Sequence, residues 1–152
     1  MVKNTFILIP SRIGSTRLKN KPLIDLQGKS LIQRAVLNAL DITENTYVAT
    51  DSSLVKENVL EISKNVIMTS SEHISGTDRI CEGYKKIKKN YDLVLDVQGD
   101  EPLISPLHID KVIEFHLKNL NYDIILPNLK IKATNNTNIV KIVSNKKNEV
   151  MY

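Results

Sequence analysis

The chain has little cysteine and histidine, and each shortage excludes a class of site. A single cysteine, Cys81, cannot form an internal disulfide, which argues against a disulfide framework and predicts a reducing, cytoplasmic location. The three histidines, His73, His108 and His116, are scattered and lack the short spacing of a zinc site. We therefore expect neither a disulfide-stabilised secreted domain nor a structural zinc centre.

Long apolar runs are also absent. No stretch approaches the roughly 18 apolar residues that a membrane-spanning helix needs, so no membrane partner is expected. The start of the chain lacks a small-residue cleavage site and is typical of a first strand rather than a signal peptide. With 152 residues, 41% of them hydrophobic and 25% charged, the composition is typical of one globular domain.

The net charge of +4 comes from one segment. Residues 12–29 hold five basic side chains against Asp25 alone, and the basic and acidic residues of the remaining chain balance. A basic excess confined to one loop favours a small anionic ligand over a nucleic-acid surface. We therefore expect no nucleic-acid partner.

Segments of strand type alternate with segments of helix type. Strands are expected at residues 5–9, 45–50, 66–68, 92–97, 123–129 and 139–143, and helices at residues 30–40, 54–63, 77–87 and 105–120. Ser30 and Gln33 form a capping-box pattern, and Ser105 before Pro106 is typical of a helix start. The alternation predicts an α/β protein with a doubly wound, mostly parallel, Rossmann-like sheet.

The last residues predict that the chain is part of a longer protein. It stops at residues 150–152, where a new apolar strand would begin after a turn at 145–148. No linker or repeat divides the chain. We therefore expect one domain over residues 1–152, the N-terminal part of something longer.

The most informative segment is the strand that ends in Gln98-Gly99-Asp100-Glu101-Pro102. Open α/β sheets bind ligands at the carboxyl edge of their strands. A carboxylate at that edge, facing phosphates, is where a hard divalent cation would be held. Asp100 is therefore a candidate Mg²⁺ ligand; the alternative is a turn carboxylate that caps the following segment.

A basic loop follows the first expected strand. Small residues at 14–16 lie between Arg12 and Arg17, and Lys21 follows shortly after. Small residues let backbone N–H groups approach phosphate oxygens, and the three cations would neutralise a triphosphate. The Gly-Lys-Ser/Thr ending of a Walker A loop is missing. A basic surface loop without a ligand remains the alternative.

A third candidate segment, Ser75-Gly76-Thr77-Asp78-Arg79, begins an expected helix. A helix N-terminus with a glycine and hydroxyl groups can bind a phosphate or the polar edge of a base. A plain N-cap role for Ser75 or Thr77 fits the pattern equally well.

The three segments occur together, in order and at consistent spacing. They read Pro10-Ser11-Arg12 with Ser15-Thr16-Arg17-Leu18 and Lys21-Pro22-Leu23, then His73 to Arg79, then Val97 to Pro102. Over essentially its whole length the chain resembles the 3-deoxy-manno-octulosonate (Kdo) cytidylyltransferases, which have the nucleotide-diphospho-sugar transferase fold. Each motif alone is shared with other sugar nucleotidyltransferases, whereas Ser-Gly-Thr-Asp-Arg coupled to Val-Gln-Gly-Asp-Glu-Pro is specific to the Kdo enzymes.

The resemblance implies a cytoplasmic enzyme that joins CTP to Kdo, with Mg²⁺ as cofactor, giving CMP-Kdo and pyrophosphate for lipopolysaccharide synthesis. The residues it assigns to CTP are Pro10, Ser11, Arg12, Ser15, Arg17, Lys21, Ser75, Gly76, Thr77 and Arg79. Those it assigns to catalysis are Arg12, Arg17, Lys21, Gln98 and Asp100, with Asp100 holding the metal.

The chain departs from the family in two ways. Lys19-Asn20 replaces the usual Pro-Gly before the loop lysine, although asparagine tolerates positive φ better than most residues. The family also continues past Tyr152, and the resemblance places there its sugar-binding residues, a second metal-binding aspartate and much of its homodimer surface.

Two other functions stay open at this stage: an inactive CTP-binding fragment or remnant, and a general anion-binding module. The sequence does not distinguish Kdo from its 8-amino analogue, a natural truncation from an artificial one, or one oligomeric state from another.

Overall fold

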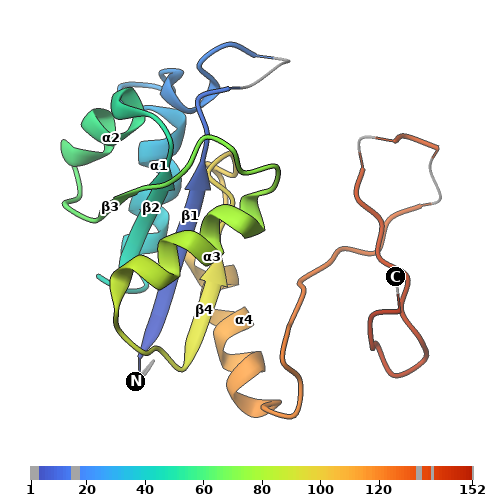
Figure 1. The fold of residues 1–152 in the computed structure, drawn as a ribbon. Helices are drawn as coiled ribbons and strands as arrows, with labels where there is room; N and C mark the ends of the chain where they lie inside the picture. The colour runs from blue at the N-terminus through green and yellow to red at the C-terminus, as the bar shows by residue number, and fades with distance from the viewer. Residues whose placement is uncertain (1–3, 15–17, 133–134, 138, 152) are drawn as a thin grey trace.

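The computed structural model describes residues 4–14, 18–132, 135–137 and 139–151. The elements are β1 (Thr5–Ser11), a 3-10 turn η1 (Lys21–Leu23), α1 (Leu31–Leu40), β2 (Thr46–Thr50), α2 (Ser53–Leu60), β3 (Val66–Met68), α3 (Gly76–Ile87), β4 (Leu93–Asp96) and α4 (Pro106–Lys118). Beyond α4 the chain leaves this body as an extended arm (Figure 1). No helix of the described residues is long and apolar enough to cross a membrane.

The four strands form one parallel sheet in the order β3-β2-β1-β4. Thr5 of β1 pairs with Leu93 of β4, and Ile7 pairs with Thr46 of β2 on the other side. From β1 the sheet extends to β2 and then β3 on one side, and to β4 on the other side. The strand order therefore reverses between β1 and β4. The predicted parallel α/β sheet is confirmed.

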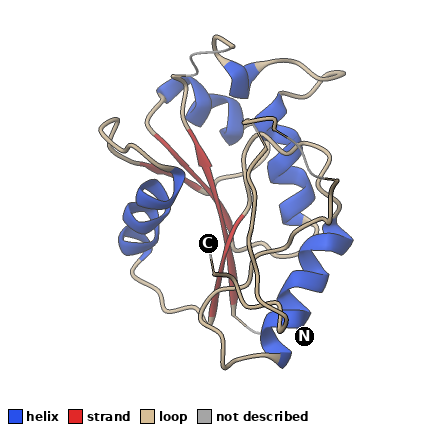
Figure 2. Ribbon diagram, turned by 90° about the vertical axis from the view of Figure 1, so that its right-hand side faces the viewer, coloured by secondary structure: helices blue, strands red, loops and turns tan. Residues whose placement is uncertain are grey.

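Side chains of β1 alternate between two apolar layers, as the pleat of a strand requires. Ile7 and Ile9 are fully buried in the cluster that includes α1, α2 and α4 residues, whereas Phe6 and Leu8 are fully buried against the face of α3. Figure 2 shows α3 alone on one face of the sheet and the other helices on the opposite face. Helices cover both faces, as expected of a doubly wound sheet.

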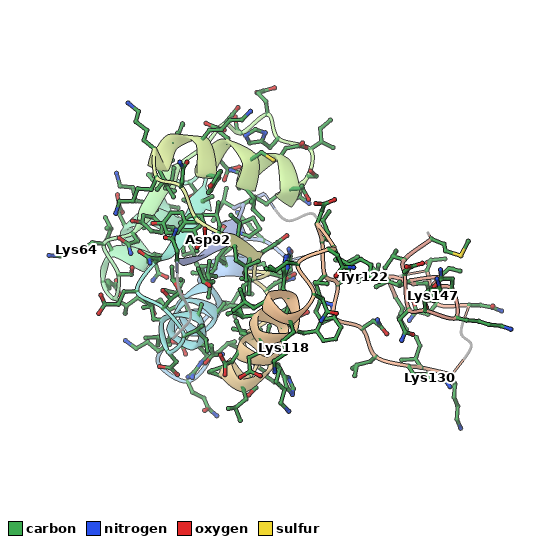
Figure 3. All side chains as sticks on the ribbon, turned by 90° about the horizontal axis from the view of Figure 1, so that it is seen from below. Lys64, Asp92, Lys118, Tyr122, Lys130 and Lys147 are labelled. Atoms are coloured by element: carbon green, nitrogen blue, oxygen red, sulfur yellow. The ribbon has the colours of Figure 1, made fainter. Side chains whose placement is uncertain are left out.

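The strands predicted at residues 123–129 and 139–143 are wrong. Neither range forms a strand, and only an isolated antiparallel bridge joins Ser144 to Val150. The segment lies away from the sheet, and no strand among the described residues lies beside it, so Ile124 is 76% exposed and Val140 is 90% exposed. Figure 3 shows Lys130 and Lys147 on this arm, apart from the body that carries Lys64.

The turn predicted at residues 145–148 is confirmed, because the backbone N–H of Asn148 donates to the carbonyl of Asn145 at 3.0 Å.

The two serines predicted to begin helices differ in what their side chains do. The Ser30 hydroxyl accepts from the Gln33 backbone N–H at 3.1 Å, and the Gln33 side chain accepts from the Ser30 backbone N–H at 3.1 Å, so the predicted capping box is confirmed. Ser30 also donates to Asn58 of α2 at 2.6 Å. Ser105 occupies the N-cap position of α4, but its side chain makes no capping hydrogen bond.

This difference predicts unequal costs for the same substitution. Ser30→Ala should lower the free energy of unfolding by about 1–2 kcal/mol, because a buried cap and its bond to α2 are lost. Ser105→Ala is the matched control and should change that free energy by less than about 0.5 kcal/mol. Urea denaturation of both variants measures the difference. Equal losses would contradict the assignment of the Ser30 hydroxyl as the stronger cap.

Candidate active site

A cleft of about 270 Å³ opens at the carboxyl ends of β1 and β4. This is the point where the strand order reverses, and it is the usual ligand position in an open α/β sheet. The lining residues come from the end of β1, the turn η1, the start of α1, the start of α3 and the segment after β4: Pro10, Ser11, Arg12, Lys21, Pro22, Leu31, His73, Ile74, Ser75, Gly76, Arg79, Gln98, Gly99 and Asp100.

The structure brings most of the predicted site residues into this cleft. Those that line it are Pro10, Ser11, Arg12, Lys21, Ser75, Gly76, Arg79, Gln98 and Asp100. Thr77 lies in the first turn of α3, exposed and outside the lining set. The predicted roles of Ser15 and Arg17 lie outside the described residues.

Lining residues that the sequence reasoning missed include His73, Ile74 and Gly99. All three lie inside the motifs already singled out, so motif membership was the available signal.

The floor of the cleft is formed where β1 and the segment after β4 approach each other closely. A Cβ placed on Gly99 would lie 3.0 Å from the Pro10 carbonyl oxygen, 3.0 Å from the Ile32 side chain and 3.3 Å from the Ile9 side chain. A side chain there would push against β1 backbone. Glycine at position 99 therefore allows the two strand ends to lie in contact under the cleft.

Two opposite charges face each other across the cleft. The Lys21 ammonium donates to Oδ2 of Asp100, and the two side chains are 32% and 48% exposed. Lys21 is held in place by η1, whose N-cap residue Asn20 adopts a left-handed φ of 52°. The Asp100 carboxylate thus lies in the lining of the cleft, paired with a cation of this chain.

Asp100 does not act as a turn cap. Its one hydrogen bond within the described part of the chain is the ion pair with Lys21. The neighbouring turn is closed by backbone atoms instead, because the Glu101 N–H donates to the Gln98 carbonyl at 3.1 Å. The capping alternative therefore has no support in the hydrogen bonds.

Gln98 is oriented by the last residue of β4. Its side-chain amide donates to Oδ1 of Asp96 at 2.7 Å. Burial raises the pKa of the Asp96 carboxyl, and the hydrogen bond from Gln98 acts in the opposite direction. Asp96 therefore fixes the Gln98 side chain at the rim of the cleft.

The N-terminus of α3 forms another wall, and Ser75 is its N-cap. The Ser75 hydroxyl accepts from the Asp78 N–H at 3.1 Å and donates to the Asp78 carboxylate at 2.7 Å, an interaction that lowers the pKa of Asp78. The plain N-cap role is therefore present. Because the hydroxyl is committed to the helix, contact between Ser75 and a ligand would fall to its backbone.

Arg79 is buried behind this wall. Its side chain is 3% exposed; Nη1 donates to the Thr69 hydroxyl at 2.5 Å and Nη2 donates to Oδ2 of Asp51 at 2.9 Å. The other Asp51 oxygen accepts from the Ile13 backbone N–H at 3.4 Å. The sequence reasoning missed Asp51, although its place directly after β2 puts it at the same edge of the sheet.

Glu82 of α3 holds the segment that carries His73. Its Oε2 accepts from the Ser70 N–H at 2.9 Å and lies 2.5 Å from Nε2 of His73, while Oε1 pairs with Lys86 at 2.6 Å. Lys86 also donates to the Met68 carbonyl at 2.8 Å. Lys86 first, then the Ser70 N–H and His73, lower the pKa of Glu82 from 4.5 to about 2.

The lowered pKa of Glu82 predicts that its contacts with the segment that carries Ser70 and His73 stabilise the fold less in acid. Because the folded pKa lies below the unfolded value, the stabilisation is full above pH 4.5 and is lost as the pH falls toward about 2. Glu82→Gln should therefore flatten the fall in melting temperature over this range. Glu114→Gln, which removes an exposed pair with Lys118, is the control. Thermal unfolding at a series of pH values measures the melting temperatures of the two variants. If the melting temperature of Glu82→Gln depends on pH as that of the wild type does, ionised Glu82 does not stabilise the fold.

The donor set fits one kind of metal binding. No group of three or more His, Cys, Asp or Glu side chains in the described ranges could hold a metal ion by itself. Asp100 nevertheless presents a half-exposed carboxylate in the lining of the cleft. Mg²⁺ usually keeps several waters and is bound by one or two carboxylates together with substrate phosphates. The cleft therefore suits a metal that arrives with a phosphate ligand.

Comparisons with known proteins agree on one family. The family model described as "Cytidylyltransferase" matches residues 6–152. The chain is 38% identical to 3-deoxy-manno-octulosonate cytidylyltransferase of Parabacteroides distasonis over 95% of this chain and 60% of that protein. It is 44% identical to 8-amino-3,8-dideoxy-manno-octulosonate cytidylyltransferase of a Shewanella species over 80% of this chain and 54% of that protein.

Solved structures lead to the same group. CMP:2-keto-3-deoxy-manno-octonic acid synthetase complexed with CTP aligns with a TM-score of 0.72 and 36% identity, over 78% of this chain and 49% of that chain. A cytidylyltransferase from Leptospira borgpetersenii aligns with a TM-score of 0.62 and 25% identity, over 76% of this chain and 50% of that one. The chain thus spans about half to three-fifths of the length of these proteins.

Proposed function

Because this chain belongs to the cytidylyltransferase family, we propose that its cleft binds CTP and that the protein activates Kdo with it. The products would be CMP-Kdo and pyrophosphate, in the cytoplasm, for lipopolysaccharide synthesis. The relatives named for Kdo and for its 8-amino analogue both support this class of acceptor and leave the choice between the two sugars to experiment.

The observation that carries the proposal is the ion pair between Lys21 and Asp100 inside the cleft. It provides a cation for a phosphate oxygen and a carboxylate for a metal, side by side at the carboxyl edge of the sheet. Arg12 adds a second cation to the same lining. A nucleoside triphosphate with its metal would satisfy both members of the pair at once.

The chemistry assigned to the site depends mostly on charge neutralisation and positioning. Lys21 and Arg12 would hold phosphate oxygens of CTP, and the backbone at Pro10, Ser11 and Gly76 would frame the cytidine. Asp100 would hold Mg²⁺, which supplies charge stabilisation at the phosphates when bound. Gln98, oriented by Asp96, would lie between the metal and the sugar. Ser15 and Arg17 remain candidate triphosphate ligands on the strength of their motif.

The reaction would be an in-line displacement at the α-phosphorus. The anomeric hydroxyl of Kdo attacks that phosphorus, its proton leaves, and the bond to the pyrophosphate oxygen breaks. Lys21 would neutralise charge that builds on the α-phosphate oxygens as this occurs. Alignment of the hydroxyl with the leaving group accounts for much of the acceleration in such transfers.

A second candidate function is CTP binding without turnover. It is favoured by one observation: the chain spans only 60% of the Parabacteroides relative and 49% of the CTP-bound structure. We propose that residues 1–152 form the nucleotide-binding part, and that the sugar pocket, a second metal carboxylate and the homodimer surface belong to the remaining length of such relatives.

Two measurements test the proposal. Calorimetry should detect CTP binding to this chain with Mg²⁺ present, and weaker or no binding of ATP under the same conditions. A pyrophosphate-release assay with CTP, Mg²⁺ and either Kdo or 8-amino-Kdo then separates the two functions. Binding with little turnover supports the nucleotide-binding part alone; turnover like that of a full-length relative supports the complete enzyme. Absence of CTP binding would contradict both.

A further inference from the structure

We propose that Asp51 and Arg79 form a buried latch that positions two walls of the cleft, and that Arg79 acts through this latch rather than as a direct CTP ligand. The inference rests on the proposed function for the identity of the nucleotide. The latch itself rests on contacts between described residues.

The latch joins four segments of the chain. Asp51 follows β2 and binds the Ile13 N–H of the loop after β1 with one oxygen, at 3.4 Å. Its other oxygen accepts from Nη2 of Arg79 at 2.9 Å. Nη1 of Arg79 donates to Thr69, directly after β3, at 2.5 Å. One carboxylate and one guanidinium therefore connect the loop that bears Arg12 to the first turn of α3.

The environment makes each partner dependent on the other. The Arg79 side chain is 3% exposed and that of Asp51 is 13% exposed, so neither charge is well solvated. Removing one partner of a buried pair leaves the other charge without compensation. The planar fork of arginine also holds Asp51 and Thr69 at the same time, which a lysine ammonium on a flexible stem would do less well.

The same contacts argue against direct recognition of the nucleotide by Arg79. Although Arg79 lines the cleft, its two terminal nitrogens are engaged behind the wall by Asp51 and Thr69. A phosphate or base that took these nitrogens would have to displace a buried carboxylate. Arg12 is exposed and the Lys21 side chain is 32% exposed, so a phosphate can contact either cation without breaking a buried ion pair.

The variants are chosen so that each removes one part of the latch. Asp51→Asn keeps the side-chain shape, but its amide has one acceptor oxygen for two donors, so Ile13 and Arg79 compete for that oxygen and the bond to Ile13 is no longer secured. Thr69→Val removes the other acceptor at nearly constant volume. Thr46→Val is the matched control: Thr46 is 1% exposed and its hydroxyl donates to the Thr43 carbonyl at 2.7 Å, at the opposite end of β2 from the cleft.

We expect Asp51→Asn to weaken CTP binding about tenfold and Thr69→Val to weaken it by a smaller factor, since bonds to charged groups that align the walls are lost. Thr46→Val should lower the urea midpoint and leave CTP affinity unchanged. In the nucleotide-free chain, NMR should show faster hydrogen exchange of the Ile13 amide in Asp51→Asn and not in Thr46→Val.

Each result has a consequence. If Asp51→Asn and Thr69→Val bind CTP as the wild type does, the latch does not position the cleft and the inference is overturned. If Asp51→Asn fails to fold, Thr69→Val and the Thr46→Val control still decide. If the wild type binds no CTP, the proposed function fails, and the Ile13 exchange comparison alone tests whether Asp51 holds the loop.

Discussion

Asp100→Asn is expected to remove most of the Mg²⁺ dependence of CTP binding. In the wild type, CTP should bind at least about tenfold more tightly with Mg²⁺ than with a chelator, because a carboxylate and the phosphates share the cation. The variant keeps the size of the side chain and the turn that Gln98 and Glu101 close with backbone atoms. Calorimetry of both proteins with Mg²⁺ and with EDTA measures the effect.

The adjacent carboxylate is the matched control for this experiment. Glu101 is exposed and lies outside the lining of the cleft. Its substitution with glutamine removes the same negative charge as Asp100→Asn. Glu101→Gln should therefore retain the Mg²⁺ dependence. Equal CTP affinity of the wild type with and without the metal would refute the assignment of Asp100 as a metal ligand.

Gly99→Ala is expected to lower the free energy of unfolding by about 1–3 kcal/mol, the usual cost of overpacking. The added methyl group would lie 3.0 Å from the Pro10 carbonyl oxygen, and that oxygen belongs to the central strand rather than to a flexible side chain. Relief of the clash requires β1 and the segment after β4 to move apart at the floor of the cleft. CTP affinity should therefore fall as well.

Gly76→Ala is the control, because it lies at the same cleft and adds the same methyl group. Its Cβ would lie 3.4 Å from the Pro10 side chain, which is an ordinary contact, and alanine at a compatible position is neutral or slightly stabilising. Urea denaturation of the two variants should therefore give clearly different free energies of unfolding. Similar losses for both would mean that the close approach at Gly99 does not constrain the floor.

The sequence predicts strands well only where a neighbour exists to pair with them. The apolar character of residues 5–9 and 92–97 predicts strands, and both ranges enter the sheet within two residues of the expected bounds. Residues 123–129 have similar character, yet remain without a partner in the described structure. Strand propensity measures how well side chains fit a pleated, half-buried surface, and the sequence does not say whether that surface is present.

The same limit applies to the site. Motifs placed Lys21 and Asp100 at one sheet edge, since both follow strands whose carboxyl ends coincide. They could not show that the two charges pair, because that depends on side-chain positions across the cleft. The motif resemblance assigns Arg79 to the nucleotide, whereas its bonds to Asp51 and Thr69 depend on the fold.

The central place of β1 has a consequence for how the protein is made. Thr5 pairs with Leu93, so β1 leaves the ribosome well before β4, the strand that covers its second edge. At a synthesis rate of about 5–20 residues per second, that interval lasts several seconds. Until then the floor between Pro10 and Gly99 does not exist. A nascent chain that is stalled before β4 should therefore expose an open strand edge and be a target for chaperones.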